Sequence, residues 1–83
     1  MDYKYIFSTM VHQKLKEHII GGIFVRVTYN DELYVRIESY NDLKFEIRFS
    51  DMANKIRNGY TSDYAVYEIV KEYKKYVLER YFV

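Results

Sequence analysis

Two histidines, His12 and His18, are the first residues to examine for catalysis or metal binding in this 83-residue chain. They stand six positions apart, so on a helix they point in different directions and cannot share a metal ion as an i, i+4 pair can. The chain has no cysteine, no glycine-rich phosphate loop and no serine in a nucleophile elbow. Its acidic residues are scattered rather than clustered. We therefore expect a protein that is not an enzyme and that uses no metal ion or other cofactor.

Tyrosine is the residue whose placement most suggests recognition. Six of the eleven tyrosines lie between residues 55 and 83, in a stretch with helical periodicity. Tyr64 and Tyr67 fall away from the apolar stripe of this helix, on the same side as Lys71, whereas Tyr73, Tyr76 and Tyr81 fall within it or at its edges. A tyrosine-rich, partly basic surface is typical of binding interfaces. A solvated face supported by Glu–Lys pairs explains the same pattern equally well, and both interpretations stay open.

A second group combines arginines with an aromatic residue on the expected solvent face of a β-sheet. Such a face can stack bases and hold phosphates, or it can be a solvated ladder of complementary charges, or a protein interface. Loops of three residues would pair Arg26 with Arg36 and Thr28 with Tyr34 in the first hairpin. In the second hairpin they would pair Arg36 with Glu46 and Tyr34 with Arg48. The candidate nucleic-acid face consists of Arg26, Tyr34, Arg36 and Arg48.

The elements that must position these residues follow from hydrophobic periodicity. Apolar residues recur with helical spacing over 3–19, and Gly21-Gly22 ends that helix. Period-two alternation then predicts three strands, separated by polar breaks at 30–32 and 40–42. A short helix over about 50–59 and a long helix from Ser62 to about residue 81 complete the chain. The expected side chains of the core faces are Tyr3, Phe7, Met10, Val11, Leu15 and His18 on the first helix, and Ile23, Val25, Val27, Tyr29, Leu33, Val35, Ile37, Leu43, Phe45, Ile47 and Phe49 on the strands.

This order predicts a single α+β domain over residues 1–83. Its three-stranded antiparallel meander would carry the N-terminal helix and the two C-terminal helices on one face. Thirteen basic and twelve acidic residues give a net charge of +1, which does not by itself indicate nucleic acid or a membrane surface. The sequence lacks a long apolar run and a signal-peptide pattern, so we expect a cytoplasmic protein that is not bound to a membrane.

The same order, read with two local motifs, resembles the small phage-encoded type II-A anti-CRISPR inhibitors that have an α-βββ-αα layout. The motifs are "IFVRVTYNDELYVRIES" in the first hairpin and "KIRNGYTSDY" at the junction of the last two helices. In the second, a run of basic, Asn, Gly, aromatic, acidic and Tyr residues matches that family. The matching positions are Arg57, Asn58, Gly59, Tyr60, Asp63 and Tyr64.

The resemblance implies a function in blocking an RNA-guided DNA nuclease. That family is similar to a DNA mimic whose carboxylates occupy the cleft in which the nuclease reads a short duplex motif. By position, the corresponding carboxylates here are Asp31, Glu32 and Asp63. The family is strongly acidic and this chain is neutral, so the inhibitor class could hold while the mimicry mechanism does not.

We therefore expect a non-enzymatic inhibitor from a phage or other mobile element that binds a host defence protein, with a type II CRISPR nuclease as the first expectation. The alternatives are a small nucleic-acid-binding accessory protein and a self-associating module, so the state is a monomer or a homodimer. The expected partner-binding residues are Asp31, Glu32, Tyr60, Asp63, Tyr64, Tyr67 and Lys71.

Overall fold

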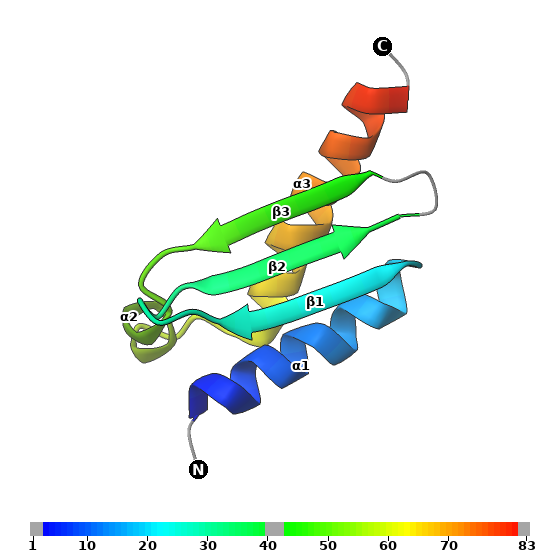
Figure 1. Ribbon diagram of the computed structural model, residues 1–83. Helices are drawn as coiled ribbons and strands as arrows, with labels where there is room; N and C mark the ends of the chain where they lie inside the picture. Colours follow the sequence, from blue (N-terminus) through cyan, green and yellow to red (C-terminus); the bar gives the residue numbers. More distant parts are fainter. Residues whose placement is uncertain (1–2, 40–42, 82–83) are drawn as a thin grey trace.

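A helix, a three-stranded meander and two further helices follow one another along the chain, in a computed structural model that describes residues 3–39 and 43–81. Helix α1 (Tyr3–His18) leads into strands β1 (Gly22–Val27), β2 (Leu33–Glu38) and β3 (Lys44–Phe49) (Figure 1). The chain continues through α2 (Met52–Arg57) and ends in α3 (Ser62–Tyr81). The predicted α+β fold is confirmed. The predicted break at 40–42 lies outside the described residues.

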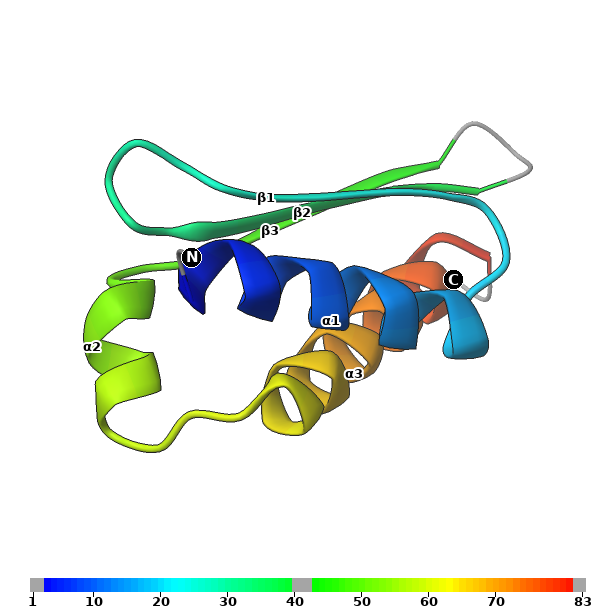
Figure 2. The ribbon, with the colours of Figure 1, turned by 90° about the horizontal axis from the view of Figure 1, so that it is seen from below.

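The sheet is antiparallel with the strand order β1-β2-β3. Helices α1 and α3 lie on the same face of it, and α2 sits at one end (Figure 2). The structure thus has two layers, and no helix of residues 3–39 and 43–81 covers the other face of the sheet, as the alternation of apolar and polar residues predicts.

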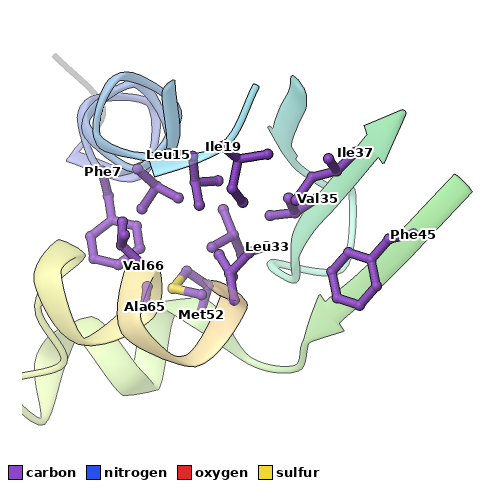
Figure 3. Packing of buried hydrophobic residues seen from close by; sticks show 12 residues of the cluster. Phe7, Leu15, Ile19, Leu33, Val35, Ile37, Phe45, Met52, Ala65 and Val66 are labelled. Atoms are coloured by element: carbon purple, nitrogen blue, oxygen red, sulfur yellow. The ribbon is translucent and has the colours of Figure 1, made fainter. Parts of the chain in front are cut away.

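The core lies between the sheet and the two long helices (Figure 3). Leu15 of α1, Ile37 of β2 and Ile69 of α3 are fully buried, as is Met52 of α2. Every second residue of β2 faces this layer, and residues three or four apart do so on the helices. The other buried apolar residues of the cluster are Phe7, Val11, Ile19, Leu33, Val35, Phe45, Ala65 and Val66.

Four side chains expected in the core are not there. Tyr3 and Met10 lie on the exposed side of α1, and His18 is exposed while Ile19, just beyond the helix end, is buried in its place. Tyr29 was expected to extend the apolar face of the first strand. That strand ends at Val27 and the ring of Tyr29 is fully exposed, because the chain has already entered the hairpin loop.

The two hairpins differ in how well their registers were predicted. In the second, Arg36 pairs with Glu46 and Tyr34 with Arg48, as expected. In the first, Arg26 pairs with Tyr34 and Phe24 with Arg36, so the predicted register is wrong by two residues. The loop has the expected length but occupies 29–31 rather than 30–32. The Thr28 N–H donates to the Glu32 carbonyl, and Asp31 adopts a positive φ of 59°, the residue-in-αL arrangement of a three-residue hairpin loop.

Candidate protein-binding surfaces

The expected partner-binding residues are distributed over three places rather than one. Asp31 and Glu32 belong to the connection between β1 and β2, Tyr60 and Tyr64 line a hollow at the α2–α3 junction, and Asp63, Tyr67 and Lys71 line a groove between α1 and α3. The last two places adjoin, because Asp63 and Tyr64 are consecutive in the first turn of α3. The loop at 29–31 is separate from them.

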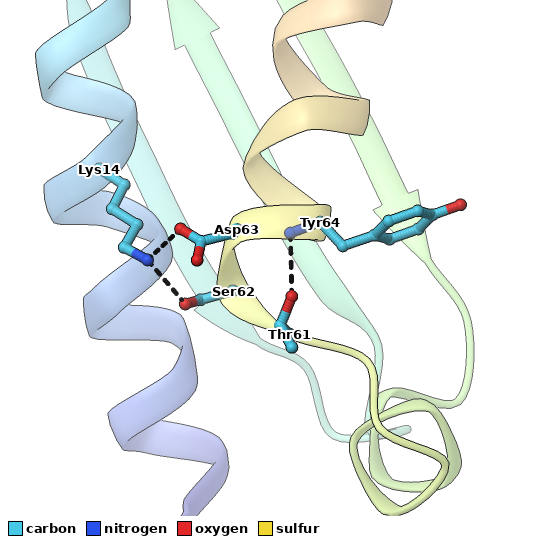
Figure 4. Close-up of polar contacts among 5 residues, drawn as sticks. All are labelled: Lys14, Thr61, Ser62, Asp63 and Tyr64. Atoms are coloured by element: carbon cyan, nitrogen blue, oxygen red, sulfur yellow. Dashed lines mark hydrogen bonds and ion pairs between the residues drawn. The ribbon is translucent and has the colours of Figure 1, made fainter.

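The first turn of α3 fixes the directions in which its residues point. The Thr61 hydroxyl accepts a hydrogen bond from the Tyr64 N–H at 3.2 Å, which satisfies one of the free amides at the helix start. Figure 4 shows that Asp63 and Ser62 then face α1, where both contact the Lys14 ammonium, while the Tyr64 ring points the opposite way. Sequence neighbours therefore serve different surfaces.

Two of the three expected carboxylates have cationic partners within the protein. The Asp31 carboxylate is 2.6 Å from the Lys4 ammonium, and the Asp63 carboxylate pairs with Lys14. Asp63 also lies at the positive end of the α3 dipole. Glu32 is half-buried. An arginine-rich partner would have to compete with Lys4 and Lys14 for these charges.

Tyr60 is a packing residue as well as a surface residue. Its ring lies 6.1 Å from Phe7, 6.4 Å from Phe49 and 5.0 Å from Tyr64, centroid to centroid. Its hydroxyl is buried and has no hydrogen-bond partner within the described part of the chain. Burial, with smaller contributions from Glu68 and Tyr64, raises the pKa of Tyr60 to about 12. A partner could contact Tyr60 only at the part of its side chain that lines the hollow.

Tyr64 and Tyr67 remain available on the outside of α3, with exposed fractions of 52% and 63%. Tyr64 forms one wall of the hollow, whose other lining residues include Lys55 and Gly59. Tyr67 lies along the α1–α3 groove. Tyr73 and Tyr76, by contrast, pack edge-on against Phe45, and the Tyr76 hydroxyl donates to the Lys44 carbonyl at 2.8 Å. The predicted division between core and surface tyrosines holds for these four residues, and the side chain of Tyr81 lies outside the described part of the chain.

The candidate nucleic-acid residues do gather on the open face of the sheet. The guanidinium carbons of Arg26 and Arg48 lie 5.1 and 5.4 Å from the centre of the Tyr34 ring. Arg36 lies in the same way over Phe24, at 5.5 Å. These are cation–π distances. Only 7% of Tyr34 is exposed although the helices are on the other face, so neighbouring side chains on its own face cover the ring.

The register correction explains this arrangement. The predicted pairing placed Arg26 opposite Arg36, two like charges. The observed pairing places an aromatic residue opposite each arginine of the first hairpin instead. Such aromatic–cation contacts stabilise a sheet by themselves, so the face has a structural explanation that requires no ligand.

No group of three His, Cys, Asp or Glu residues among residues 3–39 and 43–81 is placed to hold a metal ion. Over the same residues, no helix is both long enough and apolar enough to cross a membrane. Comparisons of the chain with protein-family models, curated proteins and solved structures gave no significant match. The class that the fold and surfaces define is a small α+β domain with exposed tyrosines on its last helix.

Proposed function

We propose that this protein is a non-enzymatic inhibitor, encoded by a phage or other mobile element, that binds a host defence protein. The observation that carries the proposal is the pair of tyrosines on the free side of α3, Tyr64 and Tyr67, each more than half exposed. A tyrosine ring provides a large contact area with little loss of side-chain entropy on binding, which is why such residues dominate interface energetics.

The target that we propose is a type II CRISPR RNA-guided DNA nuclease. Support comes from the resemblance of the "KIRNGYTSDY" junction to that inhibitor family and from the agreement between the α-βββ-αα layout that it implies and the order of elements in the structure. Tyr64 belongs to the junction motif, and Tyr67 follows it by one helical turn.

The mechanism that we propose is occlusion by an aromatic surface rather than mimicry of DNA charge. Asp31 and Asp63 already pair with lysines of the same chain, and the net charge is +1. A DNA mimic needs a dense array of unpaired negative charges to compete for arginines that read bases. Contacts through Tyr64 and Tyr67, with Lys71 at the edge, would instead cover the cleft or hold the nuclease in a form that cannot load its target.

The proposal is tested by a cleavage assay with purified nuclease, guide RNA and target DNA. The protein is added either before or after the DNA. Occlusion predicts protection when the protein is added first and little protection once the target strand is paired with the guide. Full cleavage by several type II nucleases in both orders, with no complex formed on gel filtration, would rule out this target.

A second candidate function is nucleic-acid binding through Arg26, Tyr34, Arg36 and Arg48, because the fold brings these four side chains onto one open sheet face. Stacking of a base requires an exposed ring, and the exposed ring on this face is Phe24, at 47%. This function predicts DNA or RNA binding that weakens steeply as salt is added, through release of counterions. Flat binding curves at low salt would exclude it.

A further inference from the structure

The α1–α3 groove, which Tyr67 borders, combines an apolar part with charged side chains. It has a volume of about 610 Å³ and is lined by the C-terminal part of α1 and the N-terminal two thirds of α3. Val66, which is buried, and Val70, which is half-buried, form its apolar part, and the Tyr67 ring borders it. Its other lining residues are Lys14, Glu17, His18, Asp63, Lys71 and Lys74.

Apart from the Lys14–Asp63 ion pair, lysines outnumber acidic residues in the lining of the groove. Lys14 and Asp63 neutralise each other across the groove. Lys71 and Lys74 are exposed on α3, and neither has an ion-pair partner among residues 3–39 and 43–81. Glu17 is the remaining acid of the lining. The edge is therefore basic around an apolar centre, and the charge complementary to it is negative.

The walls of the groove favour a helix as the occupant. Both walls are α-helices, and the backbone N–H and C=O groups away from the helix ends are hydrogen-bonded within the helix. An extended peptide would find few free backbone partners there, whereas a helix satisfies its own backbone and needs only side-chain contacts. Helices also pack side by side by inserting rows of side chains between one another, and Val66 and Val70 are four residues apart on one such row.

We propose that the α1–α3 groove binds an acidic amphipathic helix of the partner protein. Apolar side chains of that helix would contact Val70 and Tyr67, and its flanking carboxylates would meet Lys71 and Lys74. The inference rests on the proposed function, because it assigns the chemistry of the segment that the inhibitor recognises. In DNA mimicry the inhibitor carries the negative charge, whereas in the proposed groove contact the partner helix carries it.

The probe is a synthetic helical peptide of about 15 residues, the length at which isolated helices begin to be stable. It has leucine on one face and glutamate on the flanks, and the control peptide carries lysine in place of glutamate. The full-length protein is titrated with each peptide and followed by NMR. We expect the glutamate peptide to shift the amides of Lys14, Tyr67, Val70 and Lys74, and the lysine peptide to bind at least about tenfold more weakly.

Two double variants separate the groove from general charge effects. Lys71→Glu with Lys74→Glu reverses the basic edge, whereas Lys16→Glu with Lys75→Glu makes the same charge change at exposed positions of α1 and α3 that do not line the groove. The first is expected to weaken binding of the glutamate peptide about tenfold, mainly through slower association, and the second by less than about threefold. No binding of the glutamate peptide, equal binding of the lysine peptide, or equal losses in the two variants would overturn the inference.

The same variants in the cleavage assay distinguish this inference from the proposed function. If Lys71→Glu with Lys74→Glu still inhibits the nuclease as well as the unmodified protein does, the groove is not the recognition site and the inhibitor function stands. If the peptide results are as expected but the unmodified protein inhibits no nuclease, the proposed target fails and the groove keeps its preference for acidic helices.

Discussion

Tyr60, which the junction motif places at the partner surface, also supports the packing of three elements of the fold. Its ring joins α1, β3 and α3 through Phe7, Phe49 and Tyr64. Its position in the "RNGYTSDY" motif predicts a role at the partner surface, but a motif does not specify which side of the chain is covered. The ring also packs near Phe7 of α1, more than fifty positions earlier in the chain, and no local pattern indicates that contact.

The Tyr60→Phe variant isolates the hydroxyl. Because this group has no hydrogen-bond partner among the described residues, its removal should change the free energy of unfolding by less than about 1 kcal/mol and could raise it. Tyr60→Ala removes the ring and should lower it by about 3 kcal/mol. Urea unfolding of both variants provides the measurement. A loss of more than about 2 kcal/mol in Tyr60→Phe would mean that the hydroxyl has a partner.

The raised pKa of Tyr60 predicts that the free energy of unfolding depends on pH. Its pKa is raised from 10.0 to about 12, so between these values the unfolded chain releases this proton while the folded protein retains it. Ionisation then favours the unfolded state, and stability from this residue is present below pH 10 and lost progressively from pH 10 to about 12. Chemical unfolding across this range should show a shallower decline in Tyr60→Phe than in the unmodified protein. Parallel declines would contradict the assignment.

At the scale of elements, the alternation of apolar and polar residues predicts the faces of the strands but not every register. Moving a three-residue loop by one position changes the pairing by two residues, and a shift of two leaves each side chain on the same face. Asn30, Asp31 and Glu32 are polar, and Tyr29 has an apolar ring with a polar hydroxyl, so the sequence is compatible with two loops of equal length, 29–31 and 30–32. The structure adopts the one that places Asp31, a residue tolerant of positive φ, at φ 59°, where its carboxylate also reaches Lys4.

The turn from α1 into β1 provides a prediction with an internal control. Gly21 has a φ of 145°, and a Cβ added there would lie 2.5 Å from the Glu38 carbonyl oxygen. Gly21→Ala should therefore lower the free energy of unfolding by about 2 kcal/mol or more. At Gly22, a Cβ would lie 3.8 Å from that of Glu38, an ordinary contact, and Gly22→Ala should change stability by less than about 1 kcal/mol. Thermal unfolding of the pair gives the comparison, and equal effects would contradict it.

At the scale of the whole molecule, the fold follows from the sequence more fully than the surfaces do. The order of elements and the central core residues, such as Leu15, Val35 and Ile37, are predicted by periodicity because burial is what periodicity reports. The α1–α3 groove depends on how two helices sit on the sheet, which periodicity along each helix does not specify. The signal that could have indicated it is the set of lysines at Lys14, Lys71 and Lys74 on the adjoining sides of those helices.

The proposed function rests on the exposed side of α3, and the affinity of tyrosine variants for the nuclease–guide complex tests it most directly. The Tyr64→Ala/Tyr67→Ala double variant is compared with Tyr29→Ala, which removes a fully exposed ring from the β1–β2 loop. Circular dichroism and urea unfolding confirm that each variant is folded.

We predict that the unmodified protein binds the complex, that the double variant loses at least about 2 kcal/mol of binding free energy, and that Tyr29→Ala binds as the unmodified protein does. Absence of binding by the unmodified protein, or equal affinity of the double variant, would contradict the claim that α3 presents a binding surface for this target.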